Sequence, residues 1–195
     1  MTAGTDEYPY QEQETINLDL TLSQFGFPLD GIVVKSSPIV ADLNSDGVKE
    51  IYFGSDYEAL HGYNSFGEEI DGFPFQSTDR VRSSPAVGDV DNDGQMEIVF
   101  GNSSGKLYVV NHDGVQQLAY NILGFIEGSP ALADMDGDQD LEIFFTTTTT
   151  SGGQLYAIHH NGITMSGFPK ELGSMWTGPA VHDIDNDGIH DIICT

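Results

Sequence analysis

A nine-residue acidic pattern that occurs four times constrains this chain of 195 residues more than any other feature. Each copy places oxygen-bearing side chains, three or four of them carboxylates, at positions 1, 3, 5 and 9. Two carboxylates about 4 Å apart repel each other by about 4 kcal/mol at an effective dielectric constant near 20. A fold that gathers several of them therefore needs a cation. The copies read DLNSDGVKE (42–50), DVDNDGQME (89–97), DMDGDQDLE (134–142) and DIDNDGIHD (183–191).

The donors and their spacing indicate calcium. Oxygen ligands favour a hard ion, and alternate side chains around a turn at position 6 are how loops wrap calcium. Glycine suits position 6 because the chain turns sharply there, often with positive φ. An EF-hand would continue to a glutamate at position 12 between two helices. Here Ile98-Val99-Phe100 follows position 9 instead, which predicts a buried strand.

The pattern therefore predicts up to four bound calcium ions, in loops that each join two strands. Positions 1, 3, 5 and 9 would supply side chains, and position 7 its backbone. The predicted metal ligands are Asp42, Asn44, Asp46, Val48 and Glu50 in the first loop, Asp89, Asp91, Asp93, Gln95 and Glu97 in the second, Asp134, Asp136, Asp138, Asp140 and Glu142 in the third, and Asp183, Asp185, Asp187, Ile189 and Asp191 in the fourth.

More than the acidic loop recurs. The copies begin at residues 42, 89, 134 and 183, so they lie 47, 45 and 49 residues apart. Two small residues and a proline precede each loop, and an apolar run follows it. Gly-Phe-Pro begins at Gly26, Gly72 and Gly167, and it is expected on or beside an outer strand because proline cannot donate to a sheet. A period of about 40 to 50 residues with four short strands is typical of a propeller blade. We therefore predict an all-β fold, a β-propeller of about four four-stranded repeats.

These motifs resemble the FG-GAP or VCBS repeat family, the calcium-loop propellers of integrin α-subunits and of many secreted bacterial proteins. The resemblance covers about residues 24–195 and implies calcium binding and an extracellular setting. Integrins carry Gly-Ala-Pro after the second strand, whereas this chain has Phe53-Gly54-Ser55 and Phe100-Gly101-Asn102. Integrin ligand recognition is therefore not carried over. The third loop has Gln139 where the others have glycine, so we expect that site to be distorted or weak.

The repeats divide the chain into a linker or disordered segment at 1–14 and a propeller domain at 15–195. Within 15–34, apolar residues alternate with polar ones from Ile16 to Ser23, which predicts a half-buried strand. This partial blade and another at 175–195 could combine into one. The alternatives are a small closed propeller, a piece of a larger one, or a homo-oligomer through open edges. The complete blades are expected at 35–80, 81–126 and 127–174.

The amino-acid composition limits the classes of molecule that this protein is expected to bind. Six basic residues against 31 acidic ones give a net charge of −25, which argues against nucleic acid and anionic membranes as partners. The single Cys194 excludes an internal disulfide. No apolar stretch is long enough to insert in a membrane. Calcium loops of extracellular modules bind weakly, at about 0.1 to 1 mM, so a secreted or cell-surface location is expected.

Catalytic patterns are scarce. The sequence has no nucleophile elbow, no zinc spacing and no phosphate-cradling glycine loop, so we expect no enzyme activity. The adjacent His159 and His160 suggest a metal, but neighbours on a strand point to opposite faces. We therefore prefer the interpretation that one of these two imidazoles is packed against the protein and the other is isolated, over a shared metal site. Acid–base catalysis by the third loop explains none of the other copies, so calcium is preferred there as well.

The face opposite the acidic loops is the predicted ligand-binding surface. It should gather Tyr57, Arg80, Arg82, Phe125 and Trp176, and arginine and aromatic residues dominate binding hot spots. The alternative is ordinary packing between blades. We expect a recognition or adhesion module for a glycan or protein. Two other hypotheses are a propeller portion of a secreted polysaccharide-degrading enzyme, which the few basic residues disfavour, and a structural subunit of a surface filament.

Overall fold

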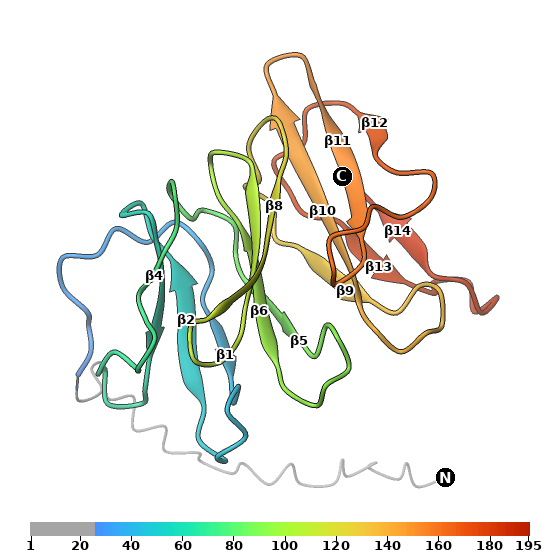
Figure 1. The fold of residues 1–195 in the computed structure, drawn as a ribbon. Coiled ribbons are helices and arrows are strands. Elements are labelled where there is room, and N and C mark those ends of the chain that lie inside the picture. Colours follow the sequence, from blue (N-terminus) through green and yellow to red (C-terminus); the bar gives the residue numbers. More distant parts are fainter. Residues whose placement is uncertain (1–25) are drawn as a thin grey trace, which may run out of the picture.

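The computed structural model describes residues 26–195, and each regular element in this range is a β-strand. Three antiparallel sheets have four strands each and a fourth has two, and neighbours in a sheet are neighbours in the chain. The sheets stand side by side in chain order like blades of a fan, and they do not close into a ring (Figure 1). The predicted all-β propeller architecture is confirmed. The strand predicted within 15–34 and the boundary at residue 14 lie outside the described residues.

The sheets have the following strands. Blade 1 contains β1 (Ile39–Ala41), β2 (Glu50–Gly54), β3 (Ala59–Tyr63) and β4 (Phe75–Gln76). Blade 2 contains β5 (Ala86–Gly88), β6 (Glu97–Gly101), β7 (Lys106–Val110) and β8 (Gln116–Asn121). Blade 3 contains β9 (Ala131–Ala133), β10 (Glu142–Thr149), β11 (Gly152–Ile158) and β12 (Lys170–Leu172). The two-stranded sheet contains β13 (Ala180–His182) and β14 (Asp191–Ile193).

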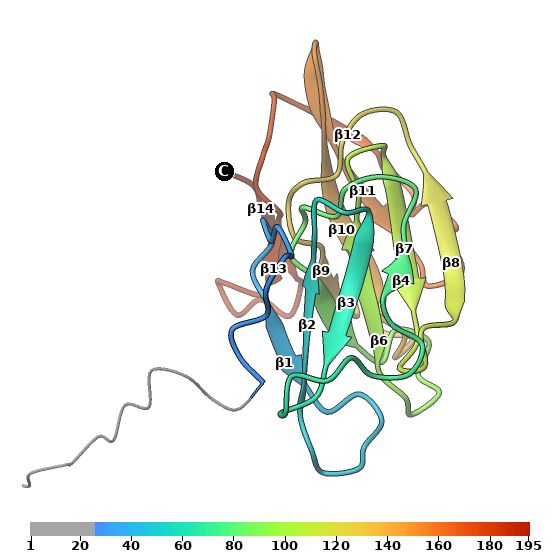
Figure 2. The same cartoon turned by 90° about the vertical axis from the view of Figure 1, so that its left-hand side faces the viewer.

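The first strand of each blade lies on the inner side of the fan. Strand β9 contacts both β5 and β13, its counterparts in the neighbouring sheets. Figure 2 looks along the row, with blade 1 in front and the other sheets behind it. Residues just before the first strands are therefore brought together at one end of the fan, and the acidic loops lie at the other.

The hydrophobic core lies in layers between the blades. Side chains on a strand alternate between its two faces, and a blade between two others buries both. Accordingly Ile98 and Phe100 of β6 pack in the layer between blades 1 and 2, while Val99 packs in the layer between blades 2 and 3. The same alternation places Phe144 of β10 toward β13 and β14, in a layer with Ile192. This explains why the apolar runs after the acidic loops have no polar alternation.

The small residues before the proline have a specific role in blades 1 and 2. The Ser83 hydroxyl donates to the carbonyl of Gly101 at 3.0 Å and accepts from its N–H at 2.7 Å. Ser36 makes the same pair of bonds with Gly54. The glycines are required because a Cβ at Gly101 would collide with Ile126. Each serine therefore clamps the entry of its blade to the end of the second strand.

Two of the three Gly-Phe-Pro segments, those at Gly72 and Gly167, lead directly into outer strands, as predicted, whereas the first strand after Gly26 in the described range is β1. The Phe73-Pro74 peptide bond is cis and immediately precedes β4, and the cis Phe168-Pro169 bond immediately precedes β12. Gly72 has a φ of 87°, and a side chain there would collide with the backbone of Asp113 in blade 2. The segment thus joins an outer strand to the next blade.

The threonine run extends β10 and lengthens its hairpin with β11, which projects above the other blades in Figure 1. Within this run at 146–150, Thr146, Thr147 and Thr148 are buried, and the run becomes exposed at Thr150 in the turn. Thr148 pairs with Phe125 through backbone hydrogen bonds of 2.9 Å in both directions, and its hydroxyl donates to the carbonyl of Met175. The hairpin therefore fastens blade 3 to the segments on both of its sides.

Candidate metal-binding loops and the opposite recess

The four acidic loops connect the first and second strands of their sheets, as predicted. They follow one another along one edge of the fan, in the lower part of Figure 1. Position 6 has positive φ in each of them, with values of 87° at Gly47, 89° at Gly94 and 88° at Gly188. Glycine adopts this conformation without steric cost, which is why the pattern contains it.

Backbone N–H groups orient the carboxylates of each loop. Asp89 at position 1 accepts from the N–H of Asp93 at 3.0 Å and from the N–H of Gly94 at 2.9 Å. Asp42 and Asp183 accept from the equivalent groups of their loops. The N–H of position 7 donates to the carboxylate at position 5, from Val48, Gln95, Asp140 and Ile189.

The acid at position 9 is buried beneath the loop in the first three loops, whereas Asp191 of the fourth is exposed. Glu97 is 0% exposed, and its Oε2 accepts from the N–H of Val90 at 2.9 Å. Its Oε1 has no hydrogen-bond partner among the described residues, and the same holds for Glu50 Oε2 and Asp91 Oδ1. Burial raises the pKa of the Glu97 carboxyl to about 7, and the neighbouring aspartates add to the rise. Leaving such a group unpaired is costly, and a cation would satisfy it.

In each of three loops, the ligand atoms lie close enough together to bind an ion of their own. One carboxylate oxygen from each of three acids lies within 4.8 Å of the other two in every group. In the first loop Asn44 replaces an acid, and its amide oxygen accepts from the N–H of Asp46 at 3.0 Å. The groups are Asp89, Asp91 and Glu97; Asp134, Asp136 and Asp138; and Asp183, Asp185 and Asp191.

The third loop is built differently, as expected from Gln139. This residue has a φ of 82° at position 6 despite its side chain, and glycine instead occupies position 4, where φ is positive in all four loops. The N–H of Gly137, rather than that of position 5, donates to Asp134 Oδ1 at 2.7 Å. The bond from the Gln139 N–H to Asp134 Oδ2 is 3.2 Å, compared with 2.9 Å from Gly94 to Asp89. The third loop therefore has its non-glycine residue of positive φ at position 6 rather than at position 4, where Ser45, Asn92 and Asn186 stand in the other loops, and its hydrogen-bond pattern is shifted.

We expect Gln139→Gly to stabilise the protein by about 1 kcal/mol, because glycine tolerates positive φ and glutamine does not. Urea denaturation measures this change. Gln95→Gly is the matched control, since Gln95 lies in the second loop without positive φ, and added backbone freedom should destabilise it. A gain in stability at Gln95, or none at Gln139, would contradict the strain argument.

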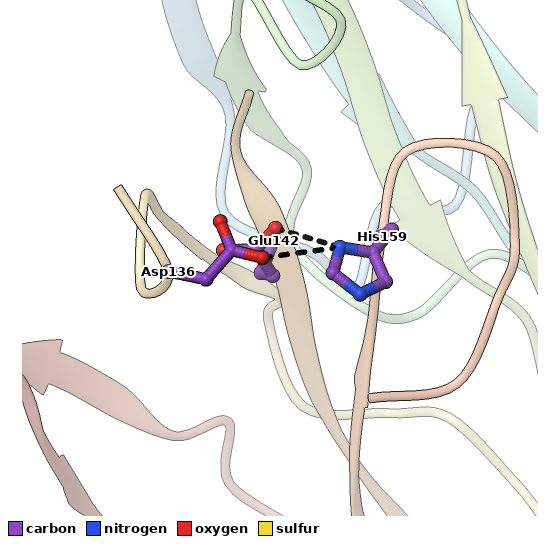
Figure 3. A group of neighbouring side chains, drawn as sticks. All are labelled: Asp136, Glu142 and His159. Carbon is purple, nitrogen blue, oxygen red and sulfur yellow. Dashed lines mark hydrogen bonds and ion pairs between the residues drawn. The ribbon is translucent and has the colours of Figure 1, made fainter. Parts of the chain in front are cut away.

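The structure corrects the expectation for the two adjacent histidines. Both lie beyond the end of β11, which is Ile158, so strand alternation does not separate them. His159 Nδ1 lies 3.0 Å from Glu142 Oε1 and 4.0 Å from Asp136 Oδ2 (Figure 3). His160 Nδ1 lies 2.7 Å from Asp140 Oδ2. Both imidazoles therefore contact acids of the third loop.

At the opposite end of the fan, two adjoining cavities bring together most of the predicted ligand-binding residues. The larger, of about 390 Å³, is lined by Lys35, Arg82, Glu127 and Trp176. The other, of about 260 Å³, adds Arg80, Ser103 and Phe125. We call the two together the recess. Tyr57 is 56% exposed in the turn after β2 and does not line either cavity.

Arg82 is held at the centre of the recess by acidic neighbours. Its Nε donates to Asp56 Oδ1 at 2.7 Å, and its Nη1 lies 3.9 Å from Glu127 Oε1. The hydrogen bond from Arg82 lowers the pKa of Asp56. Trp176 is 61% exposed beside this pair. A fixed guanidinium next to an accessible indole offers hydrogen bonds and an apolar surface to the same ligand.

The sequence profile of the FG-GAP-like repeat matches residues 89–145 and 134–194. Together these matches extend over more than half of the chain. The protein belongs to the FG-GAP-like repeat family. A search of curated proteins finds no match. Solved structures do match, and one is the crystal structure of BBS1N in complex with ARL6DN, soaked with lead.

That structure has a TM-score of 0.59 and 11% sequence identity, and the alignment covers 86% of this chain and 51% of that one. The FG-GAP chain therefore spans about half the length of that structure's chain. At this identity the likeness concerns the fold alone. Within residues 26–195 there is no helix long and apolar enough to cross a membrane.

The FG-GAP repeats explain why four unlike residues line the larger cavity. Each immediately precedes the small-residue and proline motif of its repeat, and so occupies the same repeat position. Because the first strands lie together, this position converges from every blade. Lys35 and Glu127 were not predicted as site residues, although aligning the repeats on their prolines would have identified them.

Proposed function

We propose that this FG-GAP propeller is a non-enzymatic, calcium-stabilised recognition module that acts outside the cell and binds a glycan in its recess. In the first and second loops, the position-9 glutamates Glu50 and Glu97 each have a buried carboxylate oxygen without a hydrogen-bond partner among the described residues, which supports calcium there. The repeated pattern extends this proposal to up to four ions. Loops of this type bind calcium at concentrations found in extracellular fluids. A net charge of −25 suits such a module, because bound cations offset part of it.

The observation that carries recognition is the convergence of one repeat position on the recess. The motif beside this position has two small residues and a proline in every repeat, yet the position itself holds a lysine, an arginine, a glutamate and a tryptophan. A packing site repeated by the fold would favour similar residues in each blade. The mixture instead provides donors, an acceptor and an aromatic face within one concave space, as in small-ligand sites.

A saccharide fits this chemistry better than a protein surface. Sugar rings present hydroxyl groups around their edge and apolar C–H faces, which the Arg82–Glu127 pair and the Trp176 indole can contact together. A cavity of about 390 Å³ has room for such a ligand. Stable protein–protein interfaces bury about 800 Å² on each partner, which exceeds what a small concave site offers.

A glycan array with the calcium-loaded protein tests this function. We expect Trp176→Ala to weaken binding to the recognised glycan by at least thirtyfold, the loss of a hot spot worth about 2 kcal/mol. Tyr57→Ala is the matched control, because its ring is similarly exposed but outside the recess. Chelation should also abolish binding by loosening the blades.

Three results would contradict the proposal. The calcium-loaded protein could bind nothing on a broad array, Trp176→Ala could bind normally, or Tyr57→Ala could lose as much binding as Trp176→Ala. If the protein bound another protein instead of a glycan, and Trp176→Ala weakened that binding equally, the recess would still be the binding site but the proposed ligand class would be wrong.

A further inference from the structure

The third loop differs from the others because an imidazole enters its group of acids. One nitrogen of His159 and one oxygen each of Asp136 and Glu142 lie within 4.8 Å of one another. Glu142 is 0% exposed, so the group has a buried carboxylate at its base. In Figure 3 all three side chains point toward a common centre, from the loop, from β10 and from the turn after β11. We propose that this group selects a transition ion of the zinc class rather than calcium.

A comparison of the blades shows that the side chain of His159 does not support its turn, as the residues at the same position in blades 1 and 2 do. It is the first residue after β11, where Asn64 follows β3 and Asn111 follows β7. Both asparagines support their turns. Asn64 Oδ1 accepts from the Phe66 N–H at 2.9 Å, and Asn111 Oδ1 accepts from the Val115 N–H at 2.8 Å.

In blade 3 another residue supports the turn. Asn161 Oδ1 accepts from the Ile163 N–H at 3.0 Å, so the turn does not require the side chain of His159. That side chain points to the acidic loop instead, with Nδ1 3.0 Å from Glu142 Oε1. The turn geometry alone therefore does not explain why an imidazole stands at this position.

His159 Nδ1 faces the oxygen of the position-9 acid that, in the first and second loops, has no hydrogen-bond partner among the described residues. In each of the second and third loops one oxygen of the position-9 glutamate accepts from the N–H of position 2, at 2.9 Å for Glu97 and 2.8 Å for Glu142. The second oxygen of Glu97 has no hydrogen-bond partner among the described residues. The second oxygen of Glu142 has His159. A nitrogen donor has thus been added at the point where an ion would contact the buried acid.

The donor set suits zinc. Calcium takes oxygen ligands, whereas imidazole together with carboxylate is a common set for zinc. Bond lengths of about 2.0 to 2.2 Å in a tetrahedral site place neighbouring donors about 3.4 Å apart. The nitrogen lies 3.0 Å from Glu142 and 4.0 Å from Asp136, so small side-chain movements suffice. One coordination position remains for water or another loop carboxylate.

Calorimetric titration of Zn²⁺ into protein saturated with calcium tests the proposal. We expect one tight zinc site per chain, and at least a tenfold loss of its affinity in His159→Asn, which installs the residue of the other blades. His160→Ser is the matched control, because it installs the blade 1 residue and leaves the three donors in place. Co²⁺ offers a second readout, since its visible absorption depends on nitrogen ligation and should change in His159→Asn alone.

The proposal is overturned if calcium displaces zinc completely, if His159→Asn keeps the affinity, or if His160→Ser loses as much. In the first two cases the contact between His159 and Glu142 is an internal hydrogen bond only. The readout is zinc, and it does not depend on whether the other loops hold calcium. Failure of the calcium proposal and failure of this one are therefore distinguishable.

Discussion

Removing calcium with a chelator is expected to lower the free energy of unfolding by about 4 kcal/mol. The three loops with glycine at position 6 each gain about 1.4 kcal/mol when calcium is at ten times its dissociation constant. For a domain of this size the melting temperature should fall by roughly 10 °C. Differential scanning calorimetry in calcium and in chelator measures the shift. Magnesium should not replace calcium, because it requires near-ideal octahedral geometry.

The Glu97→Gln variant distinguishes stabilisation by calcium bound in the second loop from a general effect of salt on stability. The substitution removes a buried charge whose Oε1 has no hydrogen-bond partner in the described part of the chain. Without calcium, the variant should be at least as stable as the original protein, because a neutral amide is less costly to bury. With calcium, it should gain less than the original protein does. Identical melting in calcium and chelator, or a variant destabilised equally in both, would refute calcium binding in this loop.

Phe100→Ala is expected to destabilise the protein by about 3 to 5 kcal/mol, as truncation of a buried aromatic side chain usually does. The Phe100 ring is 0% exposed between two blades. Its centroid lies 5.8 Å from that of Phe75 in blade 1 and 5.2 Å from that of Tyr108 in its own blade. The substitution therefore removes the centre of the layer that joins these blades.

Urea denaturation measures this effect, and Phe66→Ala is the control. Phe66 is 60% exposed, so its truncation should change stability by less than about 0.5 kcal/mol. The slope of the transition should stay constant if the blades unfold together. A loss below 1 kcal/mol, or a second transition, would contradict a core shared between blades.

The sequence predicted the fold because its strongest signals are periodic. The acidic loops, the following apolar runs and the prolines recur together, so the blade unit and the position of each loop follow from spacing alone. The hydroxyl clamp of Ser83 on Gly101 could not be predicted in this way. It depends on which backbone groups meet when the first strand of a blade folds against its second.

The site was predicted less completely, and for physical reasons. Arg82 and Trp176 were identified by residue type, whereas Lys35 and Glu127 belong to the recess only because the inner strands converge. The interpretation of His159 was wrong because β11 ends one residue before it. Strand alternation fixes side-chain direction only within a strand, and here a single residue at the boundary changed which groups meet.

The alternation of side chains along β6 has a consequence for how substitutions combine. Neighbouring residues such as Ile98 and Val99 belong to separate layers. Changes at adjacent residues should therefore add nearly independently, whereas changes at Phe100 and Phe75, far apart in sequence, should be strongly coupled. In this molecule, distance along the chain is a poor guide to which amino acids must evolve in concert.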